Sequence, residues 1–509
     1  MLISACTADP TVIPPSPAPT ETRPLPTPAE EAQAVSVLEA CEASTQAAAM
    51  RRGAVPDWEK LDSGACYDLT LDLDPADSSY RGTAEITLTH LTGAALPDLV
   101  FRTYPNSEAI YGGALEVNEV SVNGEPAEFE PFLDDRTAIR VPLSEPLAPG
   151  ETVRVEMEFE GEITEDFGGL PSVYGVFNHN TSEEFISLAN WYPILAQRKD
   201  GEWATAEVVG TGDAVVSESA LYRVQIDGPQ GWEYVTTGSR IESGDGDPGL
   251  YVSGPVRDLI VLASPNFTES SLDVDGIAVR HWGLPGGEDR WEEALQATAD
   301  SISVYEERFG EYPYAELDVV AAPLRNALGV EYPGVFLLGD DLYRDDPQRP
   351  FLLGLVVAHE AAHQWWYGVV GNDILTDPWQ DEGLTTFSST LYQEIFQPDY
   401  YEGILEGYRE TVDSVSEQFS DEELEIAQSV ADFQEHERLY SPVVYQKGAL
   451  FFQALREELG DEVFFGALKA YYEGNRYLLA PPEQLLDAFE TACGCELDEF
   501  YREWGASAE

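Results

Sequence analysis

Apolar and polar residues alternate with a period of two between residues 66 and about 260 of the chain. The alternation is clearest at Leu69–Leu73, Ala84–Leu88 and Val153–Phe159. Antiparallel strands with one buried face have this pattern, because successive side chains point to opposite faces of a sheet. Turn sequences that contain glycine, such as Val122-Asn-Gly124, separate the alternating runs. This part of the chain is therefore predicted to form an all-β domain.

From about residue 290 the apolar residues take a helical spacing instead. Glu293–Phe309 fits one helix, and the strongly apolar run Phe351–Tyr367 is long enough for a buried helix. The strand-like segment Leu317–Ala321 lies between them, and further helices are predicted at Ser441–Gly460 and Leu497–Trp504. The predicted fold class is α+β and multidomain, with an N-terminal antiparallel β domain followed by a mostly helical domain.

We predict three divisions of the chain. Residues 1–35 form a disordered tether, because eight prolines fall between Pro10 and Pro28. Residues 36–262 form the β domain, and residues 263–509 form the mostly helical domain. The hydrophobic content of 43% supports real cores in these domains, and the sequence contains no run long enough to span a membrane.

The most informative motif is His359-Glu360-Ala361-Ala362-His363, which lies within the apolar run of the predicted buried helix. Two histidines four residues apart share one face of a helix, so both imidazoles can reach one metal ion. Glu360 points to the edge of that face and can serve as a general base. The alternative is a helix with two structural core histidines.

Glu382 is the candidate for a third metal ligand. It lies on a second helix that is predicted to begin near Asp377-Pro378, a favourable cap-plus-proline start. Two histidines and one glutamate leave a fourth zinc position for water, which is the catalytic pattern rather than the closed structural one. The spacing therefore predicts one catalytic Zn²⁺ per chain, held by His359, His363 and Glu382.

Three motifs in the expected order resemble those of the gluzincin aminopeptidases, the aminopeptidase N and leukotriene hydrolase family. The first is His359–Asp373 followed by Trp379–Gly383. The second, Leu328-Gly-Val-Glu-Tyr332, is similar to the exopeptidase motif Gly-x-Met-Glu-Asn, and the third, Tyr445-Gln-Lys-Gly448, is similar to Tyr-x-Lys-Gly. The resemblance implies a saddle-like N-terminal domain and a thermolysin-like catalytic domain, in a short form without the family's C-terminal helical domain.

The resemblance also implies roles for individual residues. Tyr445 would stabilise the oxyanion that forms when water attacks a peptide carbonyl. Glu331 would bind the free α-amino group of the substrate, and Gly329 would let the backbone approach the substrate closely. Asp381 would orient a metal ligand by a hydrogen bond without contacting the metal itself. The alternative is that Asp381 is a solvated helix residue. The family's glutamine or glutamate of the N-terminal domain, which also binds the amine, has no recognisable counterpart in the sequence.

The predicted function is a zinc-dependent aminopeptidase that hydrolyses N-terminal residues from peptides with a free N-terminus. Two alternatives stay open. The chain would be a gluzincin endopeptidase if Glu331 does not face the zinc, or a non-catalytic scaffold that keeps the peptidase fold. The sequence determines neither the preferred N-terminal residue nor the oligomeric state.

The net charge of −67 is extreme, with 94 acidic against 27 basic residues. Such a surface repels nucleic acid and anionic lipid, so no nucleic-acid partner is predicted. Two explanations of the acidity stay open: adaptation to high salt, or the surface of a very soluble exported protein.

Ile3-Ser4-Ala5-Cys6 resembles a bacterial lipobox, in which the cysteine is lipidated. Either the true start lies upstream of Met1 or the match is accidental, because a signal peptide needs basic and apolar regions before its cleavage site. A lipid anchor on Cys6 followed by a proline-rich tether predicts an exported bacterial protein, anchored on the outer face of the membrane or extracellular.

Four further cysteines remain: Cys41, Cys66, Cys493 and Cys495. An even number in an exported chain favours disulfides, and three pairings are compatible with the sequence. We predict the pair Cys41–Cys66. Cys493 and Cys495 would close a very small ring and are expected to stay reduced.

Overall fold

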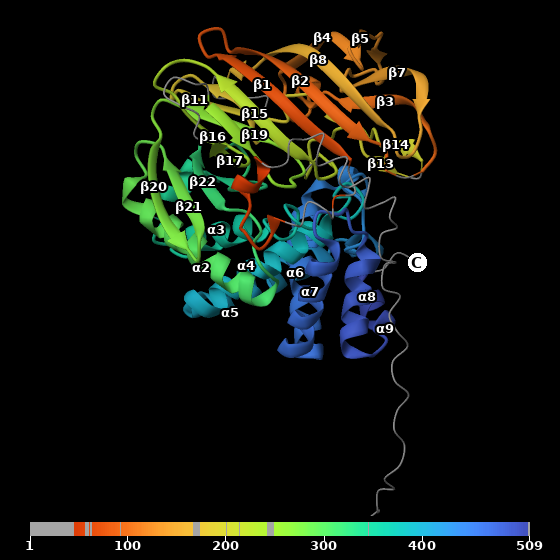
Figure 1. Ribbon diagram of the computed structural model, residues 1–509. Coiled ribbons are helices and arrows are strands. Elements are labelled where there is room, and N and C mark those ends of the chain that lie inside the picture. Colours follow the sequence, from red (N-terminus) through yellow and green to blue (C-terminus); the bar gives the residue numbers. More distant parts are fainter. Residues whose placement is uncertain are drawn as a thin grey trace, which may run out of the picture.

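The computed structural model describes residues 45–55, 61, 64–91, 93–165, 174–199, 201–212, 214–241, 249–344 and 346–506. The predicted tether, Cys6 and Cys41 lie outside these residues. An N-terminal region of β sheets lies on one side of the molecule, and a region with one further sheet and the long helices lies on the other (Figure 1). The predicted fold class is therefore confirmed.

The largest sheet of the N-terminal region has the strand order β17-β18-β15-β1-β2-β8-β4-β5. In that order its strands are Ser239–Ile241, Gly249–Val252, Leu221–Asp227, Ala65–Asp74, Ser79–Thr89, Thr152–Glu162, Ala114–Val122 and Glu125–Pro126. All described pairs in it are antiparallel except β1 with β15, which run parallel. Along β8 every second side chain is buried, as the alternation in the sequence predicts.

Two smaller sheets and one hairpin complete the described strands of this region. One sheet has the order β16-β19-β11-β10-β9: Glu233–Thr236, Ile260–Ser264, Phe185–Ala189, Phe177–Asn180 and Thr164–Glu165. The other has the order β12-β3-β7-β6: Ile194–Leu195, Leu96–Arg102, Ala138–Leu147 and Glu130–Pro131. The hairpin pairs β13 (Arg198–Lys199) with β14 (Glu202–Trp203).

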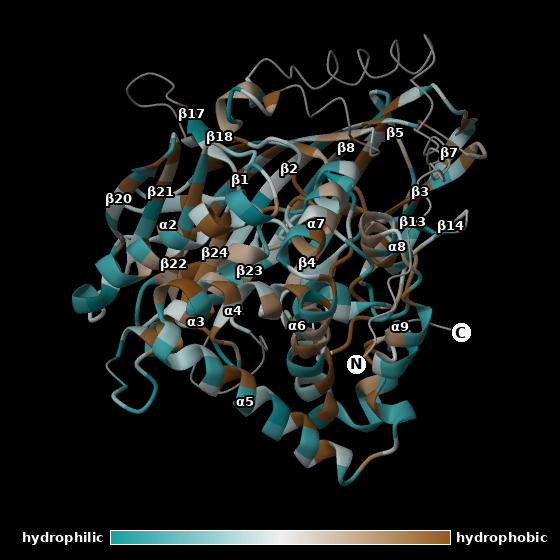
Figure 2. Cartoon of the chain, turned by 90° about the horizontal axis from the view of Figure 1, so that it is seen from below, coloured by the Kyte–Doolittle hydropathy of each residue, from teal (hydrophilic) through white to brown (hydrophobic). Residues whose placement is uncertain are grey.

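The C-terminal region begins with a sheet in the order β20-β21-β22-β24-β23. Its strands in that order are Thr268–Val274, Ile277–Gly283, Glu316–Ala322, Val335–Gly339 and Gly329–Tyr332. Every residue of β22 and β24 is buried, and most of the residues in these two strands are hydrophobic (Figure 2). β23 pairs antiparallel with β24 and forms an edge of the sheet. An edge strand presents backbone groups with which an extended peptide can pair.

The helices follow the sheet. The described α-helices are α2 Trp291–Arg308, α3 Leu352–Ala362, α4 Leu384–Phe396, α5 Pro398–Ser416, α6 Gly448–Leu459, α7 Asp461–Asn475, α8 Pro482–Cys493 and α9 Asp498–Trp504. Two π-helical segments, η6 Trp379–Gly383 and η10 Ser441–Lys447, precede α4 and α6. Short 3₁₀ turns are η1 Gln46–Ala49, η3 Tyr104–Asn106, η4 Glu288–Arg290, η5 Asp340–Tyr343, η7 Glu422–Leu424, η8 Asp432–Glu435 and η9 Glu437–Leu439.

Two predicted helices differ from the structure. The helix predicted at Phe351–Tyr367 ends at Ala362, and the chain then turns, with Tyr367 at a φ of 126°. The helix predicted at Ser441–Gly460 is divided into η10 and α6. Apolar periodicity shows which residues are buried, but it does not distinguish an α-helical turn from a π-helical one.

The cysteines give one correction. Cys493 and Cys495 form a disulfide at the end of α8, whereas the sequence analysis expected them to stay reduced. Their Cα atoms lie 5.2 Å apart, which is within the range that a disulfide spans, so the small ring does close. Cys66 lies in β1 and is disulfide-bonded. Its predicted partner Cys41 is outside the described residues, so that pairing stays a prediction.

Among the described residues, no helix combines the length and the apolar character that crossing a membrane requires.

Candidate metal centre and peptidase cleft

Three side chains converge at the end of α3. His359 Nε2 lies 3.2 Å from His363 Nε2 and 3.2 Å from Glu382 Oε2, and His363 Nε2 lies 3.5 Å from the same carboxylate oxygen. Ligands about 2.0–2.1 Å from a tetrahedral zinc are separated by roughly 3.3–3.4 Å. The three spacings therefore fit one zinc ion.

The carboxylate of Glu382 adds a second indication of a metal. Its Oε2 is buried and has no hydrogen-bond donor among the described residues. A buried acceptor without a partner is costly, and a cation between the three side chains would remove that cost. His359 and His363 lower the pKa of this carboxyl below its usual range, although burial alone would raise it.

Local backbone geometry explains how Glu382 reaches the two histidines. It lies in the π-helical segment η6, directly before α4. A π-helical turn contains one more residue than an α-helical turn and is frequent at functional sites. Helix α4 packs against α3, so the carboxylate faces the helix that carries His359.

Asp381, the neighbour of Glu382, supports the second histidine. Its Oδ1 lies 2.9 Å from His363 Nδ1, on the side of the imidazole opposite the metal position. Both side chains are about 1% exposed. A carboxylate in this place keeps the proton on Nδ1, so that Nε2 is free to bind a metal.

Glu360, the candidate base, lies over Gly329 of the edge strand. A Cβ atom at residue 329 would lie 2.3 Å from Glu360 Oε1. The glycine therefore makes room for the carboxylate of Glu360. Gly329 also lines the cleft described below, so its predicted role of letting the backbone approach the substrate stays a prediction.

Glu331 lies two residues further along β23 and is about 9% exposed. Oxygens of Glu331 and Glu360 and a nitrogen of His363 all lie within 4.8 Å of one another. Glu331 thus faces the metal centre. Burial raises its pKa well above the usual range; His363 opposes this shift, and the carboxylates of Glu382 and Glu360 add to it.

Tyr445 reaches the centre from the second π-helical segment, η10. Its hydroxyl donates a hydrogen bond to Glu382 Oε1 at 2.6 Å, and its ring lies nearly parallel to that of His359, with centroids 6.0 Å apart. Lys447, from the same motif, points away from this group: its ammonium donates a hydrogen bond to the backbone carbonyl of Leu424.

These side chains line a cleft with a volume of about 720 Å³ between the two regions of the chain. The N-terminal region contributes Tyr174 and Gly212 to its wall, and η9 contributes Glu437. A cleft of this size admits several residues of a peptide. No lysine or arginine is among the described residues that line it.

Arg257 and Asp258, which no sequence motif predicted, join the two regions. Arg257 is 1% exposed and donates hydrogen bonds to the backbone carbonyls of Ser217, Tyr367, Val369 and Leu478. Asp258 Oδ2 accepts a hydrogen bond from the Tyr367 hydroxyl at 2.5 Å. The segment that follows the metal-binding helix is therefore fastened to the N-terminal region.

Comparison with known proteins agrees with this geometry. The family described as "Peptidase family M1 domain" matches residues 293–504, which contain all three candidate metal ligands. Residues 293–504 form a peptidase family M1 domain. The resemblance inferred from the motifs is thereby confirmed.

Two relatives extend the match into the N-terminal region. It is 25% identical to Aminopeptidase M1 of Arabidopsis thaliana over 465 residues, 86% of this chain and 49% of that protein. It is 24% identical to Aminopeptidase N of Lactococcus lactis subsp. lactis over 464 residues, 86% of this chain and 50% of that protein. The chain thus spans about half the length of these relatives.

The fold is also found in solved structures. The M1 zinc metallopeptidase from Deinococcus radiodurans has a TM-score of 0.66 and 20% identity, over 87% of this chain and 93% of that one. A point mutant of the same enzyme, bound to a Tyr-Ser-Ala substrate, has a TM-score of 0.63 and 18% identity, with 87% and 94% coverage. At these identities the likeness concerns the fold.

Proposed function

We propose that the chain is a zinc-dependent aminopeptidase that removes N-terminal residues from peptides. The observation that carries the proposal is the proximity of Glu331 and Glu360 to His363, all within 4.8 Å, beside the three candidate zinc ligands. The M1 family match and the named relatives support the same reaction class.

His359, His363 and Glu382 are the proposed ligands of one Zn²⁺ ion. When bound there, zinc would polarise the substrate carbonyl and lower the pKa of water toward neutrality. Both histidines must be neutral to bind it, and Asp381 favours the tautomer of His363 that carries its proton on Nδ1.

Glu360 is the proposed general base. Its carboxylate is 4% exposed and lies between Gly329 and the metal centre. It takes the proton of the attacking water and passes that proton to the leaving amine. A buried carboxylate holds the proton between these two steps more readily than an exposed one, because burial disfavours its charged form.

Tyr445 is the proposed hydrogen-bond donor to the developing oxyanion. In the structure its hydroxyl donates to Glu382 Oε1. When the carbonyl oxygen of a substrate becomes the acceptor instead, the phenol stabilises the negative charge that attack places on that oxygen.

Glu331 is the proposed anchor of the α-ammonium group. Burial makes its charged form unfavourable unless a cation is present, and the N-terminus of a peptide supplies one. A substrate without this charge would leave the carboxyl group unpaired. The proposed role therefore limits hydrolysis to the first residue of a peptide.

The test compares peptides with free and acetylated N-termini. We expect acetylation to abolish hydrolysis, and Glu331→Ala to lower kcat/KM by about 30-fold to several thousand-fold with zinc still bound. Glu331→Asp is the graded control, because it keeps the charge and shortens the reach. Equal hydrolysis of both peptides would instead favour the endopeptidase alternative, and bound zinc without any hydrolysis would favour the non-catalytic scaffold.

We also propose that the protein is exported from a bacterium and anchored by lipid on Cys6. The lipobox-like Ile3–Cys6 and the proline-rich tether support this location. Mass spectrometry of the membrane fraction, after expression with the upstream gene sequence, tests it: an unmodified Cys6 would contradict the anchor.

A further inference from the structure

A second, smaller chamber lies behind Glu331. It has a volume of about 50 Å³, which exceeds the roughly 10–15 Å³ that a water-sized group requires. Tyr174, Gly212, Val330 and Glu331 belong to the walls of both the chamber and the peptidase cleft. The chamber therefore continues the cleft at the residue proposed to hold the substrate's amino group.

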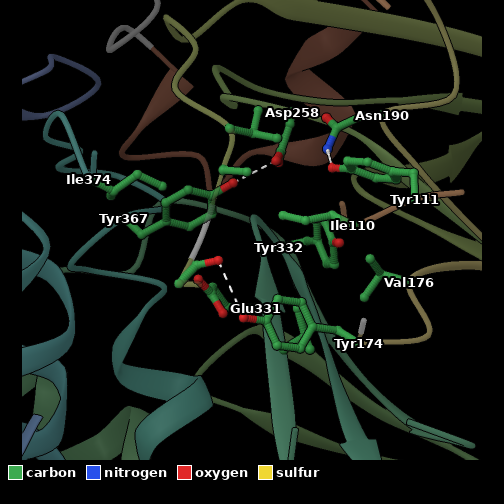
Figure 3. A pocket seen from close by; sticks show the side chains of 14 residues that line it. Ile110, Tyr111, Tyr174, Val176, Asn190, Asp258, Glu331, Tyr332, Tyr367 and Ile374 are labelled. Atoms are coloured by element: carbon green, nitrogen blue, oxygen red, sulfur yellow. Dashed lines mark hydrogen bonds between the residues drawn. The ribbon is translucent and has the colours of Figure 1, made fainter. Parts of the chain in front are cut away.

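Buried acceptor atoms line the far side of the chamber. Asp258 and Asn190 are 1% and 2% exposed, and both belong to the N-terminal region. Asp258 Oδ1 and Asn190 Oδ1 have no hydrogen-bond donor among the described residues. Figure 3 shows these two side chains across the chamber from Glu331.

The remaining polar atoms of these two side chains are already engaged. Asp258 Oδ2 accepts the hydrogen bond from Tyr367, and Asn190 Nδ2 donates to the Tyr111 hydroxyl at 2.9 Å. The atoms left over are thus acceptors, and one of them carries a charge. A buried acceptor without a partner costs free energy, which a donor placed in the chamber would offset.

The cationic side chain next to Asp258 in the sequence, Arg257, does not line the chamber and donates its hydrogen bonds to four backbone carbonyls. No lysine or arginine is among the described residues that line the chamber. The chamber therefore combines the carboxylates of Glu331 and Asp258 with an amide oxygen and no lining cation.

We propose that this chamber receives the side chain of the substrate's N-terminal residue and selects a cationic one, lysine or arginine. The inference rests on the proposed aminopeptidase function. An ammonium or guanidinium group carries several donors and a positive charge, which match the unpartnered oxygens of Asp258 and Asn190. An aliphatic side chain would leave both oxygens unpaired.

The ionisation of Asp258 agrees with this assignment. Burial raises its pKa to about 6, while the hydrogen bond from Tyr367 and the charge of Arg257 oppose the shift. The carboxyl group is therefore mostly ionised at about pH 7.5 and favours a cation over a neutral donor.

The experiment measures kcat/KM at about pH 7.5 for tripeptides that begin with arginine, citrulline, lysine or norleucine. Citrulline has nearly the shape of arginine but no charge. We expect wild type to prefer arginine to citrulline by about 10- to 100-fold, and lysine to norleucine similarly. If the wild type has a kcat/KM ratio of about one for both the arginine–citrulline and the lysine–norleucine pair, the inference is wrong. Hydrolysis of these peptides would still support the proposed function. Failure to hydrolyse any of the four would overturn both.

Two variants test whether the preference for a cationic first residue arises in the chamber. Asp258→Asn keeps an acceptor for Tyr367, and it should reduce both ratios to about threefold or less. Asp318→Asn is the matched control, because Asp318 is also buried, also accepts a hydrogen bond from an aromatic side chain (Trp282), and does not line the chamber. It should keep the wild-type ratios. Equal ratios in the wild type and in a folded Asp258→Asn variant would show that the selection arises elsewhere and would contradict this assignment.

Discussion

Gly383 and Gly448 pack backbone against backbone where the two π-helical segments end. A Cβ atom on Gly448 would lie 2.9 Å from the Cα of Gly383, and a Cβ atom on Gly383 would lie 3.0 Å from the carbonyl oxygen of Val444. This close approach brings Glu382 and Tyr445, one residue before and three residues before these glycines, within 2.6 Å of each other. Both motifs therefore need glycine at these positions for the same reason: a side chain on either residue would separate the two segments.

The first prediction concerns this contact. Gly448→Ala should push the two segments apart, weaken the bond between Tyr445 and Glu382 and lower kcat/KM by about 10-fold or more. Overpacking of this kind should also cost about 1–3 kcal/mol in the free energy of unfolding. Peptide hydrolysis and thermal unfolding of the variant measure both effects.

Gly466→Ala in α7 is the control, because nothing lies within 4 Å of a Cβ atom there. It should leave activity unchanged and stabilise the helix by about 0.4–1 kcal/mol. Wild-type activity in Gly448→Ala would mean that the contact has no role in placing Tyr445.

The second prediction separates metal binding from proton transfer. His359→Ala should lose zinc and activity together, because it removes a ligand. Glu360→Gln should keep zinc, as measured by metal analysis. It should lower kcat by about 10²- to 10⁴-fold, because an amide cannot accept the proton of water. Chelation of wild type should abolish hydrolysis, and added Zn²⁺ should restore it. A Glu360→Gln variant with near-normal turnover would refute the assignment of the base.

The third prediction concerns Asp381. Asp381→Ala removes the nearer and charged acceptor from His363 Nδ1, leaving the Trp366 carbonyl at 3.2 Å, and should weaken zinc binding by about 10- to 100-fold. Asp381→Asn should lose less, because the amide oxygen can still accept the hydrogen bond. Competition with a chelator of known affinity measures the difference. Unchanged affinity in both variants would leave Asp381 as a packing residue only.

The fourth prediction concerns the pH dependence of stability. Burial raises the pKa of Asp318 to about 8, and Glu316 raises it further, whereas Arg280 opposes the shift. The folded chain therefore holds this proton more tightly than the unfolded chain, whose carboxyl group titrates near 3.8. Its contribution to stability is present at low pH and is lost as pH rises from about 4 to about 8.

Comparison of wild type with Asp318→Asn isolates this effect, because all other titrating groups are common to both. The free energy of unfolding of the variant, relative to wild type, should rise by roughly 2–4 kcal/mol between about pH 5 and pH 8. Urea unfolding at several pH values measures it. A difference that stays constant with pH would contradict the raised pKa.

The sequence predicts those parts of the site that local periodicity and motif spacing encode. The His359–His363 pair lies on one helix face as its spacing requires, and Glu382 joins it from the next helical segment. Glu331 faces the centre from an edge strand. Only the pairing of the two histidines follows from local helix geometry. Glu382 and Glu331 approach them through tertiary packing, and they could be named only because the motif spacing and the resemblance pointed to them.

The contributions of the N-terminal region could not be predicted. Asp258 and Tyr367 meet across more than a hundred positions of the chain, and neither carries a motif that names the other. Asn190 follows an ordinary buried strand, β11. The one available signal was the pair of consecutive charged residues, Arg257 and Asp258, before the apolar strand β19. Such a pair is exposed in most proteins, and only tertiary packing makes it buried here.

Because Arg257 and Asp258 are consecutive, the contact that joins the two regions and the proposed selection of the substrate's first residue depend on the same short segment. One side chain fastens the segment after the metal-binding helix, and its neighbour forms the wall of the small chamber. A catalytic half separated from the N-terminal half would keep its three metal ligands and lose that wall. Selectivity for the first residue of the substrate should therefore follow the N-terminal half when these halves are exchanged between homologous enzymes, although that half contains none of the three zinc ligands.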